Sequence, residues 1–127
     1  MAKCDEGYIC GVCGRDVPGI AQSDLYLRYV IGLVDPEVLH TMSERHIHCN
    51  PKLAQFIVTD EFEPVEVEGE WAKSKLDPVY VSEREKLVTR GWHRLQELKQ
   101  MNGVSILEFP LPEIVQLLEK RSEAPNA

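Results

Sequence analysis

The sequence predicts a small α+β domain that is mostly helical, and three observations lead to this prediction. Its 127 residues, 43% hydrophobic and 28% charged, are enough for one modest core. Four prolines stand where a helix can begin, three of them behind an Asp or Asn that can cap it. Two Cys/His pairs, within CGVCG and HIHC, lie in the first half. We expect a long central-to-C-terminal helix, a final short helix and one or two short strands.

The first half begins with a polar, turn-rich segment, residues 1–22. Residues 23–34, SDLYLRYVIGLV, then favour a helix that Ser23 or Asp24 can cap and Gly32 can end. Three β-branched residues near the end of this stretch leave a strand open, because periodicity cannot decide so apolar a run.

Two further short helices are predicted before residue 60. An Asp-Pro pair opens residues 35–42 and an Asn-Pro pair opens residues 50–58, and each pair is typical of a helix start. In the second segment Leu53, Phe56 and Ile57 share one face, which predicts that this face is buried.

The middle of the chain is acidic. Residues 60–70, DEFEPVEVEGE, contain six acids and no base. The alternation of Val and Glu over residues 65–68 allows a short exposed strand. We interpret the segment as a solvated connector, with an acidic docking surface as the alternative.

The second half contains the clearest helix. It is predicted to start at Asp77-Pro78, to end near Met101 before Asn102-Gly103, and to bury one apolar face. The positions of that face are Val81, Val88, Trp92, Leu95 and Leu98. Residues 104–109, VSILEF, are predicted to form a buried strand. A last helix is expected from Pro112, with Ile114, Leu117 and Leu118 as its apolar face, followed by a frayed tail over residues 122–127.

The stretch YICGVCGR carries the sharpest chemical signal. Cys10 and Cys13 are separated by two residues and can present both sulfurs to one ion from a tight turn. Gly14 follows them and permits the positive φ that such a turn needs. Downstream, His46 and Cys49 repeat the spacing just before a predicted helix start. The full pattern is C-x2-C-x32-H-x2-C.

This pattern resembles the zinc knuckle of zinc ribbons and treble-clef fingers. The ligand types resemble the first site of LIM domains, and CxxCG with a ligand-bearing helix start resembles the finger of ClpX-type unfoldases. The resemblance covers residues 8–57, the spacer is much longer than in those families, and the second LIM site is absent. It implies a treble-clef-like N-terminal half and zinc binding, and nothing more.

Cys10, Cys13, His46 and Cys49 would complete the tetrahedral shell that zinc prefers. His48 is an alternative to His46, although its position beside Cys49 makes shared coordination strained. Cys4 is a second alternative for the fourth ligand. Iron also suits sulfur-rich ligands, and the interpretations without metal are a redox-active CxxC pair or ordinary buried thiols. That pair would need a βαβ context, which the sequence lacks.

A closed ligand shell predicts a structural metal site and a protein that is not an enzyme. The chain has neither the H-E-x-x-H motif of metalloproteases nor a phosphate-binding glycine loop. A zinc-dependent hydrolase or nuclease is the remaining catalytic alternative, with an open position on the metal and His46 or His48 as base. His40 and His93 are interpreted as ordinary core-edge and solvated residues, and Trp71 and Trp92 as packing residues.

The net charge of −7 and the pI of about 5.1 disfavour tight binding to a nucleic-acid backbone. We therefore expect a small protein-interaction or adaptor module whose partner is another protein. The alternative is a nucleic-acid-binding regulator that uses a small stripe of Arg90 and Arg94. No signal peptide or membrane-spanning run is present in the sequence, which predicts a cytoplasmic protein.

The predicted organisation is one domain with four segments. A metal-binding module with a helical insertion covers residues 1–59, and the acidic connector covers residues 60–76. A helix–strand–helix unit over residues 77–121 packs on the module, and a disordered tail covers residues 122–127.

Overall fold

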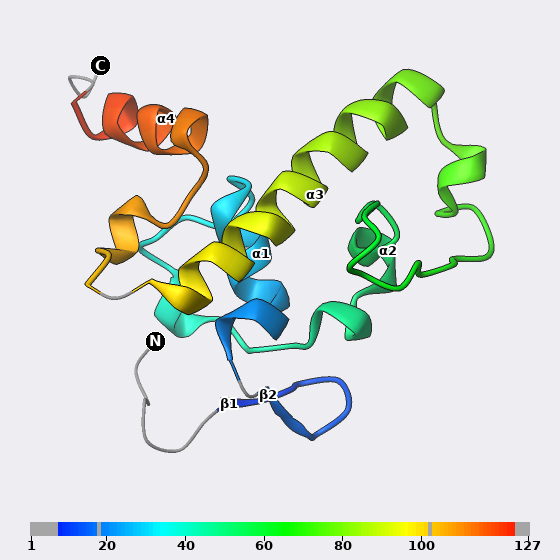
Figure 1. The fold of residues 1–127 in the computed structure, drawn as a ribbon, viewed down its shortest axis with the longest axis horizontal. Helices are drawn as coiled ribbons and strands as arrows, with labels where there is room; N and C mark the ends of the chain where they lie inside the picture. Colours follow the sequence, from blue (N-terminus) through cyan, green and yellow to red (C-terminus); the bar gives the residue numbers. More distant parts are fainter. Residues whose placement is uncertain (1–7, 18, 102, 124–127) are drawn as a thin grey trace.

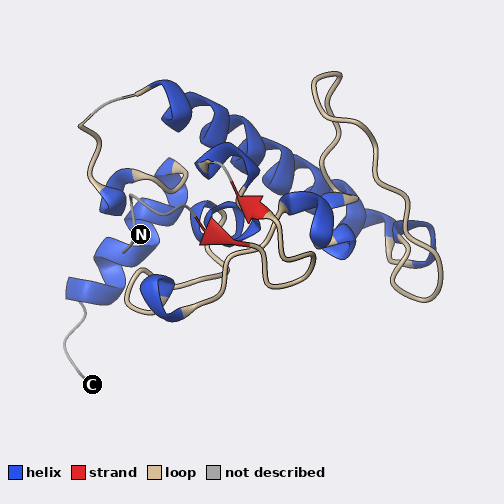
Figure 2. Cartoon of the chain, turned by 90° about the horizontal axis from the view of Figure 1, so that it is seen from below, coloured by secondary structure: helices blue, strands red, loops and turns tan. Residues whose placement is uncertain are grey.

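The computed structural model describes residues 8–17, 19–101 and 103–123. This part of the chain is mostly helical, as predicted, with a small two-stranded antiparallel sheet. Figures 1 and 2 show the long helix α3 crossing the molecule, with the sheet below it in the view of Figure 1. The elements are β1 (Tyr8–Ile9), β2 (Asp16–Val17), α1 (Asp24–Val30), α2 (Pro51–Ala54), α3 (Pro78–Gln100) and α4 (Pro112–Glu123).

Helix α1 is the centre of the fold. The Ser23 hydroxyl caps it by accepting the N–H of Tyr26 at 3.1 Å, and six of its seven residues are buried. Gly32, with φ of +88°, lies just beyond its end and takes the left-handed conformation that glycine adopts without strain. The helical interpretation of residues 23–34 is therefore confirmed over α1.

Helix α3 packs against α1 along its middle. The Asp77 side chain caps α3 by accepting the N–H of Tyr80 at 3.0 Å, with Pro78 as the first helical residue. The helix ends at Gln100, ahead of Asn102, which lies outside the described residues. The predicted start and end of the long helix are confirmed.

The two helices cross closely at Gly91. A Cβ atom at this position would lie 2.4 Å from Cγ2 of Ile31 and 3.2 Å from Cδ1 of Leu27. Alanine is ordinarily better than glycine inside a helix by up to about 1 kcal/mol. Here overpacking outweighs that gain, and we expect Gly91→Ala to lower the free energy of unfolding by about 1–3 kcal/mol. Urea denaturation measures this change, and a more stable variant would contradict it.

One cluster of buried apolar residues connects both halves of the chain. It extends from Leu25 in α1 through Leu53 and Ala54 in α2 to Leu95 in α3 and Ile114 in α4. Leu53, Phe56 and Ile57 are all buried in this cluster, as their common face predicted. The half of the chain that carries the candidate metal ligands therefore shares its core with α3 and α4.

The predicted strand over residues 104–109 is wrong. The chain forms a 3-10 turn at Ile106–Glu108, and Ile106 and Leu107 are exposed. Side chains satisfy the backbone carbonyls here: Tyr29 Oη donates to the Ile106 carbonyl at 2.7 Å, and Arg94 donates to the carbonyls of Glu108 and Phe109. With no neighbouring strand in the described part of the chain, these bonds replace a ladder.

Three smaller expectations also need correction. Residues 35–42 contain a 3-10 turn at Leu39–Thr41 instead of an α-helix. Residues 65–68 form no strand and are continuous with loop on both sides. Helix α4 extends to Glu123, two residues into the expected tail, and residues 124–127 lie outside the described residues. No helix in the described part of the chain is both long and apolar enough to cross a membrane.

Candidate metal centre

The first half of the candidate site is a tight turn between β1 and β2. Cys10 follows β1, its N–H donates to the Arg15 carbonyl at 2.8 Å, and its own carbonyl accepts the N–H of Gly14 at 3.0 Å. Gly14 has a φ of +74°, which a side chain would strain. Cys10 and Cys13 consequently lie on one side of the turn.

The second half lies between α1 and α2. His46 forms an antiparallel bridge with Ser23, and the N–H of Asp24 donates to the Arg45 carbonyl at 2.8 Å. Cys49 ends the 3-10 turn Ile47–Cys49, two residues before α2 begins. The start of α1 therefore positions the His46–Cys49 segment.

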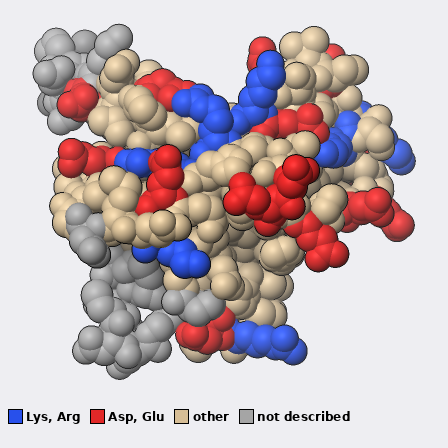
Figure 3. Space-filling model, viewed as in Figure 1, with Lys and Arg blue, Asp and Glu red and all other residues tan. Residues whose placement is uncertain are grey.

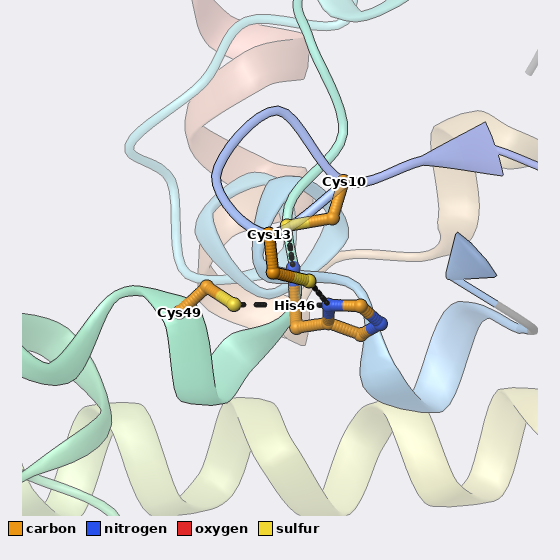
Figure 4. A group of neighbouring side chains, drawn as sticks. All are labelled: Cys10, Cys13, His46 and Cys49. Carbon is orange, nitrogen blue, oxygen red and sulfur yellow. Dashed lines mark hydrogen bonds between the residues drawn. The ribbon is translucent and has the colours of Figure 1, made fainter. Parts of the chain in front are cut away.

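The two halves meet in one cluster, which we call the Cys3His cluster: Cys10, Cys13, His46 and Cys49 (Figure 4). The four candidate ligand atoms all lie within 4.8 Å of one another. The His46 Nδ1 atom lies 3.3 Å from Sγ of Cys13 and 3.7 Å from Sγ of Cys49. A tetrahedral ion with Zn–S of about 2.3 Å and Zn–N of about 2.0–2.1 Å would set this separation at about 3.6 Å.

The imidazole of His46 is oriented for coordination. Its Nε2 atom lies 2.8 Å from the carbonyl oxygen of Asp16, which can only accept a hydrogen bond. The proton is therefore placed on Nε2, and the lone pair of Nδ1 is directed at the sulfurs. A histidine that ligates a metal ordinarily donates its other N–H in this way.

The thiols also have the chemistry of ligands. Burial alone would raise the pKa of Cys10, which is 1% exposed, but backbone N–H groups around its sulfur lower that pKa to about 5. Those of Val12 and His46 lie 3.4 and 3.5 Å from Sγ. Burial and the neighbouring Cys10 and Cys13 raise the pKa of Cys49 to about 11. Thiolates placed this close together would repel one another, and a bound divalent cation would remove that repulsion.

A buried carboxylate, which the sequence did not indicate as part of the site, supports the second half. Asp24 is fully buried and accepts hydrogen bonds from Arg28 Nε at 2.9 Å, from Arg45 Nε at 3.0 Å and from Asn50 Nδ2 at 2.9 Å. These partners flank His46 and Cys49 in the sequence or lie on α1. We call this group the Asp24 cluster.

Glu44 links the turn of the first half to α1. Its carbonyl accepts the N–H of Gly11 at 2.9 Å, and its Oε1 accepts the hydroxyl of Ser23 at 2.6 Å. Burial raises the pKa of its carboxyl group, and Oε2 has no hydrogen-bond partner among the described residues. Glu44 was also missed from the sequence, because no local pattern distinguishes it from an exposed acid.

The alternatives for the fourth ligand are placed elsewhere or are not described. His48 is exposed and stacks on Phe62, with ring centroids 4.9 Å apart and an interplanar angle of 17°. It does not belong to the Cys3His cluster. Cys4 lies outside the described residues.

No protein-family model, curated protein or solved structure matches this chain. The function is therefore inferred from the chain's own residues and geometry.

Proposed function

We propose that the Cys3His cluster holds one structural Zn²⁺ ion. The observation that carries this proposal is the convergence of three thiols and one oriented imidazole from segments 33 residues apart. When bound, zinc would supply two positive charges and four bonds at this point. The chain supplies the N–H groups that stabilise thiolates and the Asp16 carbonyl that fixes the imidazole.

The ion would act as a cross-link. The β1–β2 hairpin is joined to the rest of the described fold by the Gly11–Glu44 hydrogen bond, by the contact of His46 with the Asp16 carbonyl and by the cluster itself. Holding this turn against the His46–Cys49 segment would also fix the start of α2. A small domain gains stability from such a cross-link because its core is limited.

A closed shell leaves no coordination position for substrate, and this favours a binding module over an enzyme. We therefore propose that the chain is a small protein-interaction or adaptor module. A net charge of −7 supports a protein partner over a nucleic acid. On the face shown in Figure 3, Lys and Arg side chains gather beside the notch at the upper edge, and Asp and Glu side chains border them.

Arg90 and Arg94, the stripe predicted for nucleic-acid binding, already make hydrogen bonds within the protein. Arg90 makes a two-bond ion pair with Glu113, at 2.5 and 3.0 Å, and this pair joins α3 to α4. Arg94 donates to two backbone carbonyls and to Glu97. Neither guanidinium is free to neutralise phosphates without losing these bonds, which further supports a protein partner.

Elemental mass spectrometry of the purified protein tests the metal proposal. We expect about one zinc per chain, and loss of the cooperative thermal transition when a strong chelator removes it under reducing conditions. Added zinc should restore the transition, and added magnesium should not. A metal-free protein with the same fold would contradict the proposal, and iron in place of zinc would change the assigned ion.

A further inference from the structure

A groove of about 380 Å³ lies between α2 and the start of α3, outside the metal centre. Its floor includes the buried Leu53 and Phe56. Trp71 and Tyr80 line it as well, and they remain 56% and 45% exposed. The ring of Tyr80 meets that of Phe56 edge-on, with centroids 6.2 Å apart. Two large aromatic side chains thus border an apolar floor without being buried themselves.

Hydrogen bonds from the side chain of Gln55 hold the backbone around Trp71 in place. The buried Gln55 donates through Nε2 to the Trp71 carbonyl at 2.9 Å, and its Oε1 accepts the N–H of Lys73 at 3.0 Å. Lys73 in turn donates to the Gln55 carbonyl at 3.0 Å and to Glu85 at 2.8 Å. An exposed indole on an anchored backbone is preorganised for contact, since little conformational entropy is lost on binding.

The charge at this groove is opposite to that of the chain. Arg28, Lys52 and Arg84 line the groove, and no Asp or Glu among the described residues does. The Lys52 ammonium lies 5.0 Å from the centroid of Trp71, and the Arg84 guanidinium lies 5.6 Å from that of Tyr80. The ion pairs of the described residues do not include Lys52 or Arg84. Two uncompensated cations therefore stand beside an apolar groove in a protein of net charge −7.

We propose that this groove binds an acidic segment of a partner protein. An apolar or aromatic side chain of the segment would insert between Trp71 and Tyr80, and its carboxylates would pair with Lys52 and Arg84. This proposal rests on the interaction-module part of the proposed function. It adds the surface used and the chemistry of the partner.

Single-stranded nucleic acid fits the same surface less well. One of the chain's own cations lies over one face of each exposed ring, which leaves fewer faces for a run of stacked bases. The acidic connector leads directly into Trp71, with Glu68 and Glu70 exposed beside it in sequence. A phosphate backbone passing this segment would meet repulsion, whereas a short acidic peptide can end before it.

A library of fluorescent nonapeptides tests the proposal. Each peptide carries one central Trp, Phe, Leu or Ile among Asp and Glu residues, and control peptides replace the acids by Lys or the central residue by Ala. We expect anisotropy titrations to show binding by some acidic apolar peptides and by neither control. The double variant Lys52→Glu/Arg84→Glu should weaken binding by at least about tenfold. The control variant Lys86→Glu, which changes a residue of α3 outside the groove, should leave the affinity within about twofold of that of the parent protein.

Trp71 gives an independent readout. Trp71→Ala should abolish binding and Trp71→Phe should retain most of it, with circular dichroism unchanged in both because the indole is exposed. Absence of binding across the library, equal binding by the double variant, or selective binding of a thymidine decanucleotide at this groove would each overturn the proposal. Zinc content measured on the same samples separates the two proposals: a zinc-loaded protein that binds no peptide contradicts the groove alone, and a metal-free protein that binds contradicts the metal site alone.

Discussion

Replacing Cys10 by serine is expected to remove the metal and the cooperative unfolding transition together. Structural zinc contributes about 10–16 kcal/mol of apparent binding free energy in zinc-finger peptides. Small domains have about 5–15 kcal/mol of total stability. Losing even part of the free energy that the metal contributes would therefore exceed the stability that the rest of this fold supplies. We expect the midpoint of thermal unfolding to fall by more than about 15 °C, or the transition to disappear.

Two matched controls separate ligand loss from general damage. Cys4→Ser makes the same chemical change at a residue expected from the sequence to lie outside the ligand set, and it should leave zinc content and melting unchanged. His46→Ala should lower zinc affinity strongly, whereas His48→Ala should not, because His48 stacks on Phe62 away from the sulfurs. If Cys4→Ser lost zinc as fully as Cys10→Ser, the ligand set would be wrong.

The helix starts were predictable because they depend on local chemistry. Asp77-Pro78 and Asn50-Pro51 combine a residue that can cap with a residue whose missing N–H costs nothing in the first turn. Asp77 caps through its side chain, while Asn50 directs its amide to Asp24 instead. The position of a helix start could thus be predicted from the sequence even where the role of its cap residue could not.

The candidate ligands were predictable for a related reason. Two residues between ligands allow a single turn to direct both side chains to one point, and this spacing is visible without any tertiary information. The meeting of the two pairs was inferred only from their chemistry. The structure adds the contacts that bring them together, such as the hydrogen bond from the Gly11 N–H to the Glu44 carbonyl, which joins residues 33 positions apart.

Tertiary contacts explain the failures. The composition of residues 104–109 fits a strand, but a strand requires a neighbour to satisfy its backbone. Arg94 and Tyr29 supply those hydrogen bonds from helices α3 and α1. Asp24 was predicted only as a helix cap, because its partners Arg45 and Asn50 lie 21 and 26 residues away.

Replacing Asp24 by asparagine is expected to destabilise the fold and to weaken the metal site at once. Asp24 is fully buried and receives hydrogen bonds from Arg28, Arg45 and Asn50. Removing one side of a buried ion pair leaves the guanidinium groups without a counter-charge, at a typical cost of about 3–5 kcal/mol. For a domain of this size we expect the melting midpoint to fall by about 10–20 °C.

The effect on zinc distinguishes a positioning role from a purely structural one. Arg45 and Asn50 flank the His46–Cys49 segment, so losing their anchor lets that half of the cluster move relative to Cys10. Competition with a chromophoric chelator, at a temperature where the variant stays folded, should show zinc affinity reduced by about 10–100-fold. Asp60→Asn, the same change at an exposed acid, should alter neither quantity. An Asp24→Asn protein that melts far lower but binds zinc as tightly as the parent would show that Asp24 stabilises the core without positioning the ligands.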